Sequence, residues 1–551
     1  MIYPQIPLAQ SIIELCRLKG VTDIVISPGS RNAPLTIGFG SNPAFNCYSI
    51  ADERCAAFFA MGMAQQLRKP VAVVCTSGSA LLNYYPAIAE AFYSQIPIIV
   101  ISADRPHDKI DIGDGQTIRQ ENVYANHILY SANLLEDPSE ENNLEIIKAI
   151  DTATWQKGPV HINAPFEEPL YNTVPTPGIE ITIADVAKNE IPFELNPEFA
   201  EKWNKASKKL VLVGVDYPNE IDAAVVEKLA ADPSVVVMTE TTSNLHHENF
   251  LNSIDVIITS FTEEDFRNWQ PDILLTFGGM VVSKRIKAWL RNYKPAEHWH
   301  VDPFRAYDTY DALTAHIKTT QNNFFTQLFL KTSVRESNYQ QNALRIKERR
   351  KQQHDSYLAS VPFSDLKVFE LILPALPHGS QLQVGNSSAV RYAQLFDIKP
   401  SIEVFCNRGT SGIDGCTSTA VGAAFASGKL TTLITGDVSF FYDSNGLWNN
   451  YIPKNFKVIL INNGGGGIFR ILPGHKETPL FNKYFETEHN LTAEYLAKTF
   501  GFGYCTAHNE HELKAQLDTF FTDNVQPKIL EVFTPMREND LILKEYFKHL
   551  V

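Results

Sequence analysis

Short apolar runs alternate with amphipathic stretches along nearly the whole chain. Ala56, Phe59 and Met63 recur at the spacing of one helix face, which predicts a helix over residues 53–68. Continuous apolar strands that alternate with such helices are typical of parallel sheets covered on both faces. The predicted strands are 23–27, 71–76 and 96–102, then 209–215, 234–239, 272–278 and 298–302, then 381–385, 431–435, 457–462 and 528–533, with further helices over 8–19 and 80–93.

Two breaks in this pattern suggest domain boundaries. Residues 171–178 are rich in turn formers and predict a linker. Residues 345–354 form a strongly polar charge run, which predicts a solvated helix that leads into the next domain. The chain therefore has the pattern of three α/β domains with doubly wound parallel sheets. Their expected bounds are 1–178, 195–345 and 362–551.

Composition and charge narrow the class of protein. The chain has 551 residues, of which 44 % are hydrophobic and 20 % charged, and its formal net charge is −14. This balance disfavours nucleic acid and anionic membrane surfaces as partners. The seven cysteines include no Cys-x-x-Cys pair, and no apolar run approaches the ~18 residues that span a bilayer. We expect a cytoplasmic protein with reduced thiols, no signal peptide and no membrane insertion.

The last third holds the strongest chemical signal. Asp437 and Asn463 each follow an apolar strand and lie 26 residues apart, and a run of four glycines follows Asn463. Carboxyl ends of parallel strands bind ligands, and carboxylate and amide oxygens suit Mg²⁺ held together with a diphosphate. Each motif alone is better explained as a turn or a flexible loop. Their combination at this spacing favours a functional site.

This pairing resembles the motif of thiamine diphosphate-dependent enzymes, Gly-Asp-x followed by Asn-Asn. Val438 stands where the common form has glycine. The resemblance implies thiamine diphosphate and Mg²⁺, with Mn²⁺ as an alternative, and it implies Asp437, Asn463 and the Gly465 carbonyl as metal ligands. It also implies a catalytic glutamate, which Glu53 matches in position. Glu53 alone could be only a helix N-terminal charge. Because Glu53 and Asp437 lie in different domains, the resemblance implies a homodimer with interface active sites.

Arginines follow several predicted strands of the first and last domains. They are Arg31, Arg105, Arg391 and Arg408. Singly, such an arginine is more often part of a surface or structural ion pair. Together they would converge on one crevice, and guanidinium groups bind carboxylates bidentately. The site is therefore predicted to accept more than one carboxylate, so the net charge of the whole chain is the wrong scale for judging its substrate.

Longer segments carry a more specific resemblance. Ser-Pro-Gly-Ser-Arg-Asn-Ala-Pro-Leu from residue 27, Ser-Ala-Asp-Arg-Pro from 102 and Asn-Arg-Gly-x-Ser-Gly-Ile-Asp-Gly from 407 resemble the 2-succinyl-5-enolpyruvyl-6-hydroxy-3-cyclohexene-1-carboxylate synthase family of menaquinone biosynthesis. This resemblance implies decarboxylation of 2-oxoglutarate, conjugate (1,4) addition of the succinyl-semialdehyde carbanion to isochorismate, and release of CO₂. It covers the chain from the first strand to beyond Phe469 and is weakest in the middle domain.

The resemblance also implies a set of site residues. The catalytic residue is Glu53. The cofactor-binding residues are Glu53, Ser387, Ile413, Gly436, Asp437, Val438, Ser439, Asn463, Gly465, Ile468 and Phe469, with Ile413 beneath the rings. The substrate-binding residues are Ser30, Arg31, Arg105, Gln116, Lys284, Arg285, Ser387, Arg391, Arg408, Phe469 and Leu472, of which Gln116 is matched only by its position after Arg105.

Three other functions remain to be weighed. Another thiamine diphosphate enzyme, such as an acetohydroxyacid synthase or a 2-oxo acid decarboxylase, acts on small monoacids and would not need so many arginines. A non-catalytic relative would be expected to lack Glu53, Asp437 or Asn463. A phosphate loop at residues 464–467 fails because no Gly-Lys-Ser/Thr follows. Dimer against tetramer, regulation by a pathway product and the use of a central-domain pocket stay open.

Overall fold

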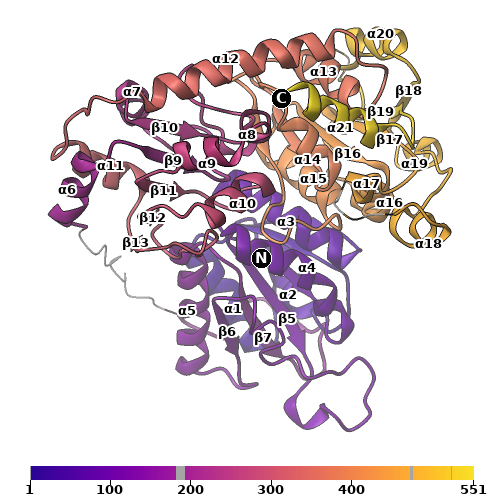
Figure 1. Cartoon of the computed structure of the whole chain (residues 1–551). Helices are drawn as coiled ribbons and strands as arrows, with labels where there is room; N and C mark the ends of the chain where they lie inside the picture. Colours follow the sequence, from indigo (N-terminus) through magenta and orange to yellow (C-terminus); the bar gives the residue numbers. More distant parts are fainter. Residues whose placement is uncertain (1, 182–192, 472–473, 475, 523) are drawn as a thin grey trace.

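The computed structural model describes residues 2–181, 193–471, 474, 476–522 and 524–551. Three large parallel sheets follow one another along the chain, and each is built from its own third of the sequence (Figure 1). Helices cover both faces of these sheets, so the predicted α/β class with doubly wound parallel sheets is confirmed. Among the described helices, none is long and apolar enough to cross a membrane.

The first sheet has the strand order β3-β2-β4-β5-β7-β6. A short antiparallel pair, β1 (Tyr3–Pro4) with β8 (Thr173–Val174), ties the two ends of this region together. The strands are β2 (Asp23–Ile26), β3 (Asn46–Ser49), β4 (Val71–Cys75), β5 (Ile98–Asp104), β6 (Tyr130–Asn133) and β7 (Val160–Pro165), and the helices are α1 (Pro7–Leu18), α2 (Ala33–Ser41), α3 (Glu53–Leu67), α4 (Ser79–Ser94) and α5 (Glu140–Gln156).

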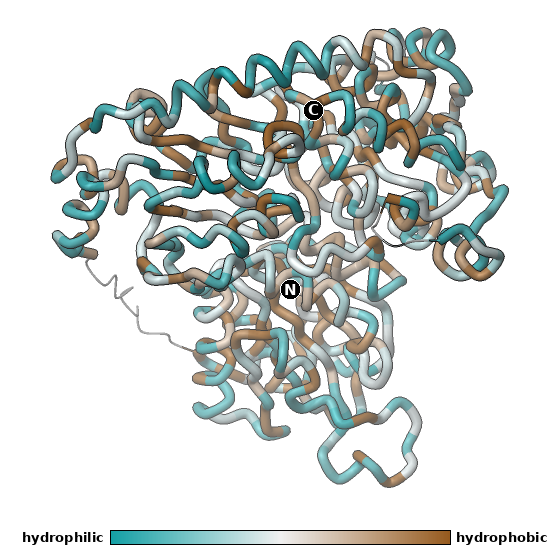
Figure 2. The backbone as a smooth tube through the Cα atoms, in the orientation of Figure 1, coloured by the Kyte–Doolittle hydropathy of each residue, from teal (hydrophilic) through white to brown (hydrophobic). Residues whose placement is uncertain are grey.

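The middle sheet has the order β10-β9-β11-β12-β13. Its strands are β9 (Lys209–Val213), β10 (Val235–Met238), β11 (Ile273–Phe277), β12 (Glu297–Val301) and β13 (Ala315–Ile317). Its helices are α6 (Pro197–Lys205), α7 (Ala223–Ala231), α8 (Ile254–Ile258), α9 (Glu263–Trp269), α10 (Lys284–Asn292) and α11 (Gln321–Phe329). The predicted charged helix is α12 (Tyr339–Leu358), which runs along the outside from the middle to the last third and is mostly hydrophilic (Figures 1 and 2).

The third sheet has the order β15-β14-β16-β17-β19-β18, which repeats the connectivity of the first sheet strand for strand. Its strands are β14 (Gln381–Val384), β15 (Glu403–Phe405), β16 (Thr431–Gly436), β17 (Phe456–Asn462), β18 (Gly503–Ala507) and β19 (Lys528–Phe533). Its helices are α13 (Asp365–Ala375), α14 (Ser388–Ala393), α15 (Cys416–Ser427), α16 (Asp437–Tyr442), α17 (Ile468–Ile471), α18 (Pro479–Phe481), α19 (Glu494–Thr499), α20 (Glu510–Phe520) and α21 (Asn539–His549).

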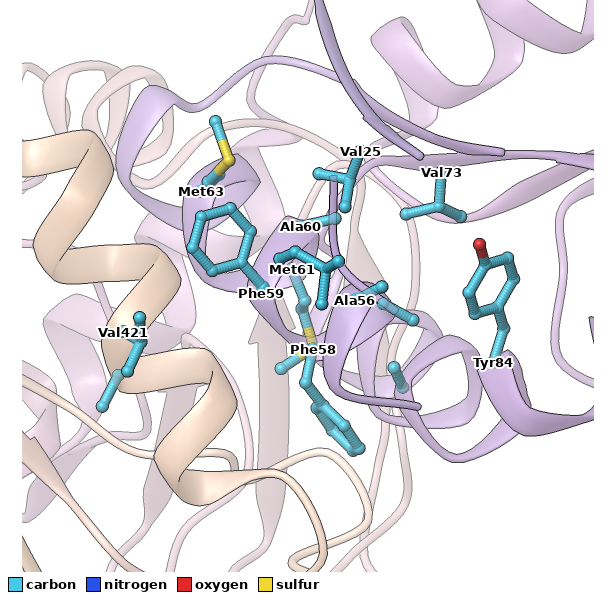
Figure 3. Close-up of a cluster of buried hydrophobic side chains, with 14 of the residues drawn as sticks. Val25, Ala56, Phe58, Phe59, Ala60, Met61, Met63, Val73, Tyr84 and Val421 are labelled. Atoms are coloured by element: carbon cyan, nitrogen blue, oxygen red, sulfur yellow. The ribbon is translucent and has the colours of Figure 1, made fainter. Parts of the chain in front are cut away.

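The first and third sheets share one hydrophobic core through the crossing of α3 and α15. Phe59 of α3 and Val421 of α15 are both buried in this core (Figure 3). The helix backbones approach closely at two glycines. A Cβ on Gly62 would lie 2.1 Å from the Thr419 carbonyl oxygen, and one on Gly422 would lie 2.0 Å from the Phe59 carbonyl oxygen. This contact packs the first and third α/β units against each other within one chain.

Candidate active site

The Asp437 carboxylate lies at the junction of β16 and α16 and is buried. Its Oδ1 accepts the Val438 N–H at 2.6 Å, and its Oδ2 accepts the N–H groups of Gly464 and Gly465 at 2.8 and 3.1 Å. The glycine loop can wrap around the carboxylate in this way because Gly464 adopts a φ of +78°, which other residues rarely adopt. The two predicted motifs therefore meet at the ends of β16 and β17.

Asn463 is oriented by a residue that the sequence did not single out. Its Nδ2 donates to Asp365 Oδ2 at 3.1 Å, so the amide oxygen is the atom left for another ligand. Thr534 Oγ1 donates to the other Asp365 oxygen at 2.6 Å. Burial raises the pKa of Asp365 to about 6. Asp365 thus holds the amide in one orientation.

The oxygen atoms at this corner suit the coordination of a divalent cation together with a diphosphate. A carboxylate offers about four lone pairs, and three backbone N–H groups use three of those on Asp437. An amide oxygen and a glycine carbonyl complete a set of hard oxygen ligands. No atom of the described residues lies within 4 Å of a Cβ built on Gly436, which leaves room for a ligand beside the strand end. Within the described ranges, no three His, Cys, Asp or Glu side chains form a metal cluster.

Glu53 is the first residue of α3, where Asp52 caps the helix by accepting the Cys55 N–H at 3.2 Å. Both neighbours of Glu53 contact the last third of the same chain. Asn445 Nδ2 donates to Asp52 Oδ2 at 2.9 Å, and Arg54 Nη1 donates to the Asp414 carbonyl at 2.6 Å. The start of α3 is therefore in direct contact with the last third of the same chain, through Asp52 and Arg54.

The loop over residues 407–415 carries both a predicted substrate residue, Arg408, and a predicted cofactor residue, Ile413. Ser439 Oγ donates to the Ile413 carbonyl at 3.1 Å, which ties the predicted wedge residue to the Asp437 corner. Asn386 Nδ2 donates to the carbonyls of Asn407 and Gly412, at 2.7 Å each. The loop is therefore anchored to both neighbouring strand ends.

Ser387 stands beside this loop in a strained conformation. Its φ is +71° and its ψ −122°, at the start of α14. Such a backbone is costly for a non-glycine residue and is often retained at functional sites.

Two of the predicted substrate arginines meet at Glu168 in the first third. Arg31 is buried and donates to the Phe166 carbonyl at 2.9 Å and to Glu168 Oε1 at 3.1 Å. Arg105 Nη1 lies 3.9 Å from the same carboxylate oxygen, and its Nη2 donates to the Gly115 carbonyl. Burial and the neighbouring Arg105 lower the pKa of Arg31. Arg31 has the partners of a structural ion pair, whereas Arg105 is more accessible.

The loop that Arg105 contacts also carries Gln116. Gln116 is exposed and has a φ of +57°, and its backbone passes over Gly78. Ser30 is exposed at the end of β2. These two residues and the arginine pair lie along the carboxyl ends of the first sheet.

A second group of cations lies between the middle and third sheets. Burial and the nearby Arg408 lower the pKa of Arg391. Arg408 Nη1 donates to Asn386 Oδ1 at 2.8 Å. Lys284 and Arg285 are exposed at the start of α10, and Arg285 stacks over the Phe547 ring at 4.7 Å. The convergence of these residues with Arg31 and Arg105 on one crevice stays a prediction.

The apolar wall is described in part. Ile468 and Phe469 are half-buried on α17, and the Phe469 ring packs edge-on against Phe485 at 5.9 Å. Leu472 lies outside the described residues.

A cavity of about 360 Å³ opens at the carboxyl ends of the middle sheet. All three thirds of the chain line it, among them Tyr93, Asp216, Arg305 and Arg408. Burial raises the pKa of Asp216 to about 7. Arg408, a residue of the loop over residues 407–415, thus also lines this cavity.

Besides Asp365, buried Glu90 and half-buried His489 also escaped the sequence patterns. Glu90 of α4 contacts the loop over residues 407–415, and its only sequence signal is one charge in an apolar helix. His489 Nε2 lies 3.4 Å from Asp437 Oδ2, from a segment with no motif. The seven cysteines are free thiols.

Three family profiles match successive parts of this chain. The profile described as the thiamine pyrophosphate enzyme, N-terminal TPP binding domain, matches residues 6–125, the middle domain of thiamine pyrophosphate enzymes matches 196–384, and the C-terminal TPP binding domain matches 383–532.

Full-length relatives carry one shared name. The 2-succinyl-5-enolpyruvyl-6-hydroxy-3-cyclohexene-1-carboxylate synthases of Flavobacterium psychrophilum and Flavobacterium johnsoniae are 65 % and 63 % identical to this chain over 100 % of both chains. The Porphyromonas gingivalis protein of that name is 39 % identical over 98 % of this chain and 96 % of its own. The solved benzoylformate decarboxylase of Polynucleobacter necessarius has a TM-score of 0.72 at 18 % identity, covers 96 % of this chain and 99 % of its own, and shows the fold alone.

Proposed function

We propose a reaction for this chain from one premise, that it belongs to the 2-succinyl-5-enolpyruvyl-6-hydroxy-3-cyclohexene-1-carboxylate synthase family of thiamine pyrophosphate enzymes. It decarboxylates 2-oxoglutarate, adds the remaining four-carbon unit to isochorismate in a conjugate (1,4) fashion, and releases CO₂. This makes it a transferase of menaquinone biosynthesis.

One observation carries the choice of acidic substrates. Among the described side chains, four arginines have a buried Nε without a hydrogen-bond partner, and three of them are the predicted substrate residues Arg105, Arg391 and Arg408. An unpaired buried donor on a charged group is costly, so such atoms call for an anionic partner. Dicarboxylates supply one, because a guanidinium fork donates two parallel hydrogen bonds to the two oxygens of a carboxylate. Pyruvate, with one carboxylate, would leave more of these donors unpaired.

Thiamine diphosphate and Mg²⁺ would be held at the Asp437 corner. Asp437, the Asn463 oxygen and the Gly465 carbonyl are the proposed metal ligands, with Mn²⁺ as an alternative ion. Gly436, Val438 and Ser439 would line the diphosphate. When bound, the thiazolium accepts the electron pair that decarboxylation releases.

Glu53 would act on the aminopyrimidine by sharing its proton. Its place at the start of α3, opposite the loop that carries Ile413, supports this role. Ile468 and Phe469 would exclude water from the reacting carbon, because early protonation would release succinic semialdehyde instead of product. Ser30, Gln116, Lys284, Arg285 and Ser387 would orient the substrate hydroxyls and carboxylates.

The substrate assignment is tested by assaying 2-oxoglutarate and pyruvate, each with and without isochorismate. We expect product only with 2-oxoglutarate and isochorismate together. Efficient turnover of pyruvate would instead support an acetohydroxyacid synthase-type enzyme.

Glu53→Gln tests the catalytic assignment. The amide keeps the size of the side chain but cannot take up the proton, so turnover should fall by at least 100-fold while cofactor binding persists. Steady-state kinetics and calorimetric titration with thiamine diphosphate and Mg²⁺ measure the two effects. Activity close to that of the wild type would remove Glu53 from its proposed role.

We also propose a cytoplasmic homodimer whose two chains share each site, with a tetramer as a further assembly. Exposed aromatic residues such as Tyr442, Trp448 and Tyr495 support a protein interface in the last third. Sedimentation should give at least twice the 61.8 kDa of one chain.

Co-expression of Glu53→Gln and Asp437→Asn chains should recover part of the activity. Assembly without recovery would mean that each chain completes its own site, as the α3–α15 contact allows.

A further inference from the structure

A carboxylate from the first third of the chain is buried in the loop over residues 407–415. Glu90 lies on α4 and is 1 % exposed. Its Oε1 accepts the Gly409 N–H at 2.6 Å, and its Oε2 accepts the N–H groups of Thr410 and Ser411 at 2.6 and 3.3 Å. Thr410 Oγ1 adds a fourth hydrogen bond at 2.8 Å. Three successive N–H groups therefore form a cradle for this anion.

The fit between helix and loop is close. A Cβ on Gly409 would lie 2.5 Å from the Glu90 carbonyl oxygen, so the loop backbone lies directly against α4. Ser411, the third N–H donor, has a left-handed backbone with a φ of +64°. No ion pair of the described residues includes Glu90, so loop donors and the Ser94 hydroxyl at 2.8 Å stabilise its charge.

The rest of the loop is anchored from its own third of the chain. Asn386 binds the carbonyls of Asn407 and Gly412 and accepts from Arg408 Nη1. The ends of the loop therefore belong to the third sheet, while its centre depends on Glu90. Arg408 immediately precedes Gly409, the first residue of the cradle.

We propose that Glu90 is a positioning residue that holds Arg408 and Ile413 in their working places. The proposal rests on the proposed function, because that function assigns these two residues to substrate and cofactor. Without the carboxylate, buried N–H groups of the loop would lose their partner, and each such loss is costly. The loop would then shift to regain hydrogen bonds and would carry Arg408 with it.

Glu90→Gln tests this directly. The amide offers one acceptor oxygen and places an NH₂ group against the remaining loop donors. We expect KM for one of the two acids to rise about tenfold with a smaller change in kcat, as for the loss of a charge-assisted hydrogen bond. Hydrogen exchange of the amides at 409–411 should accelerate. The exchange measurement reports on the loop without reference to activity.

Ser94→Ala is the matched control. It removes the other hydroxyl bound to Glu90 but leaves every hydrogen bond between Glu90 and the loop, so KM and loop exchange should stay at wild-type values. If Glu90→Gln does not fold, Thr410→Val removes one of these hydrogen bonds and should give a smaller change in the same direction. Adding Arg408→Ala to Glu90→Gln should cost less than the sum of the two changes.

The outcomes separate this proposal from the one on which it rests. If the wild type lacks synthase activity, the proposed function fails, and loop exchange alone decides the role of Glu90. If the wild type is active, unchanged loop exchange or unchanged KM values for both acids in Glu90→Gln overturn the positioning role.

Discussion

At the scale of single residues, burial changes the titration of a carboxyl group beside the site. Asp216 follows β9 at the wall of the cavity beside the middle sheet. Its Oδ1 accepts the Tyr217 N–H at 2.8 Å, and its buried Oδ2 has no hydrogen-bond partner among the described residues. Burial raises its pKa from 3.8 to about 7. The folded protein thus keeps a proton there that the unfolded chain releases, so stability falls as the pH rises from about 4 to 7.

Asp216→Asn should remove that dependence. The difference in free energy of unfolding between the variant and the wild type should grow in favour of the variant between pH 4 and 7, by no more than about 1.4 kcal/mol per pH unit, and then level off. Thermal unfolding across this pH range measures it. Asp518→Asn, at an exposed position on α20, should show no such trend. A constant difference for Asp216→Asn would contradict the prediction.

Site residues that lie within a sequence motif could be predicted from the sequence. Asp437 and Asn463 follow apolar strands, and the structure brings the two motifs together as expected. Glu90 and Asp365 had no such signal, because their partners are backbone N–H groups and an amide brought in from distant segments. Local pattern cannot report a contact that the tertiary fold creates.

At the scale of elements, the crossing of α3 and α15 depends on two glycines. Gly62→Ala would place a methyl group 2.1 Å from the Thr419 carbonyl oxygen, so the helices must separate. We expect destabilisation of about 1–3 kcal/mol, measured by denaturant unfolding.

Gly40→Ala in α2 serves as the control for this change, because its added Cβ has no neighbour within 4 Å in the part of the chain that the structure describes. It should be neutral or stabilising by up to about 1 kcal/mol. Equal effects of the two substitutions would show that the helix crossing tolerates added volume.

Apolar periodicity predicted the buried central strands to within a few residues. It missed β3 and β18, which are half-exposed at or near sheet edges and lack a continuous apolar run. It also missed β7, although β7 is central and buried. His161 and Asn163 interrupt its apolar pattern, and both find hydrogen-bond partners at Ser102. Edge exposure and satisfied polar residues therefore conceal strands from pattern analysis.

At the scale of the whole molecule, a net charge of −14 coexists with local groups of arginines. The acidic surface as a whole repels dianionic substrates, whereas the arginines attract them at short range. At 0.1 M salt, charges more than about 10 Å apart are largely screened from each other. The charges close to the site therefore determine how tightly such a substrate binds. We expect the partly buried Arg391 and Arg408 to contribute most to that balance.

We therefore expect KM for 2-oxoglutarate to rise severalfold between 0.05 and 0.5 M KCl, with little change in kcat. Initial rates at constant pH measure both parameters. A KM that falls with added salt would mean that the acidic surface controls substrate access.

The shared core of α3 and α15 also has a consequence for synthesis of the chain. The first sheet is complete long before α15, which begins about 350 residues after α3 ends. At a synthesis rate of roughly 5–20 residues per second, α15 is made about 20–70 s after α3, and only then can it pack against the apolar side of α3. During that time Phe58 and Phe59 are exposed on an otherwise folded unit. A nascent chain stalled before residue 416 should therefore bind chaperones or aggregate.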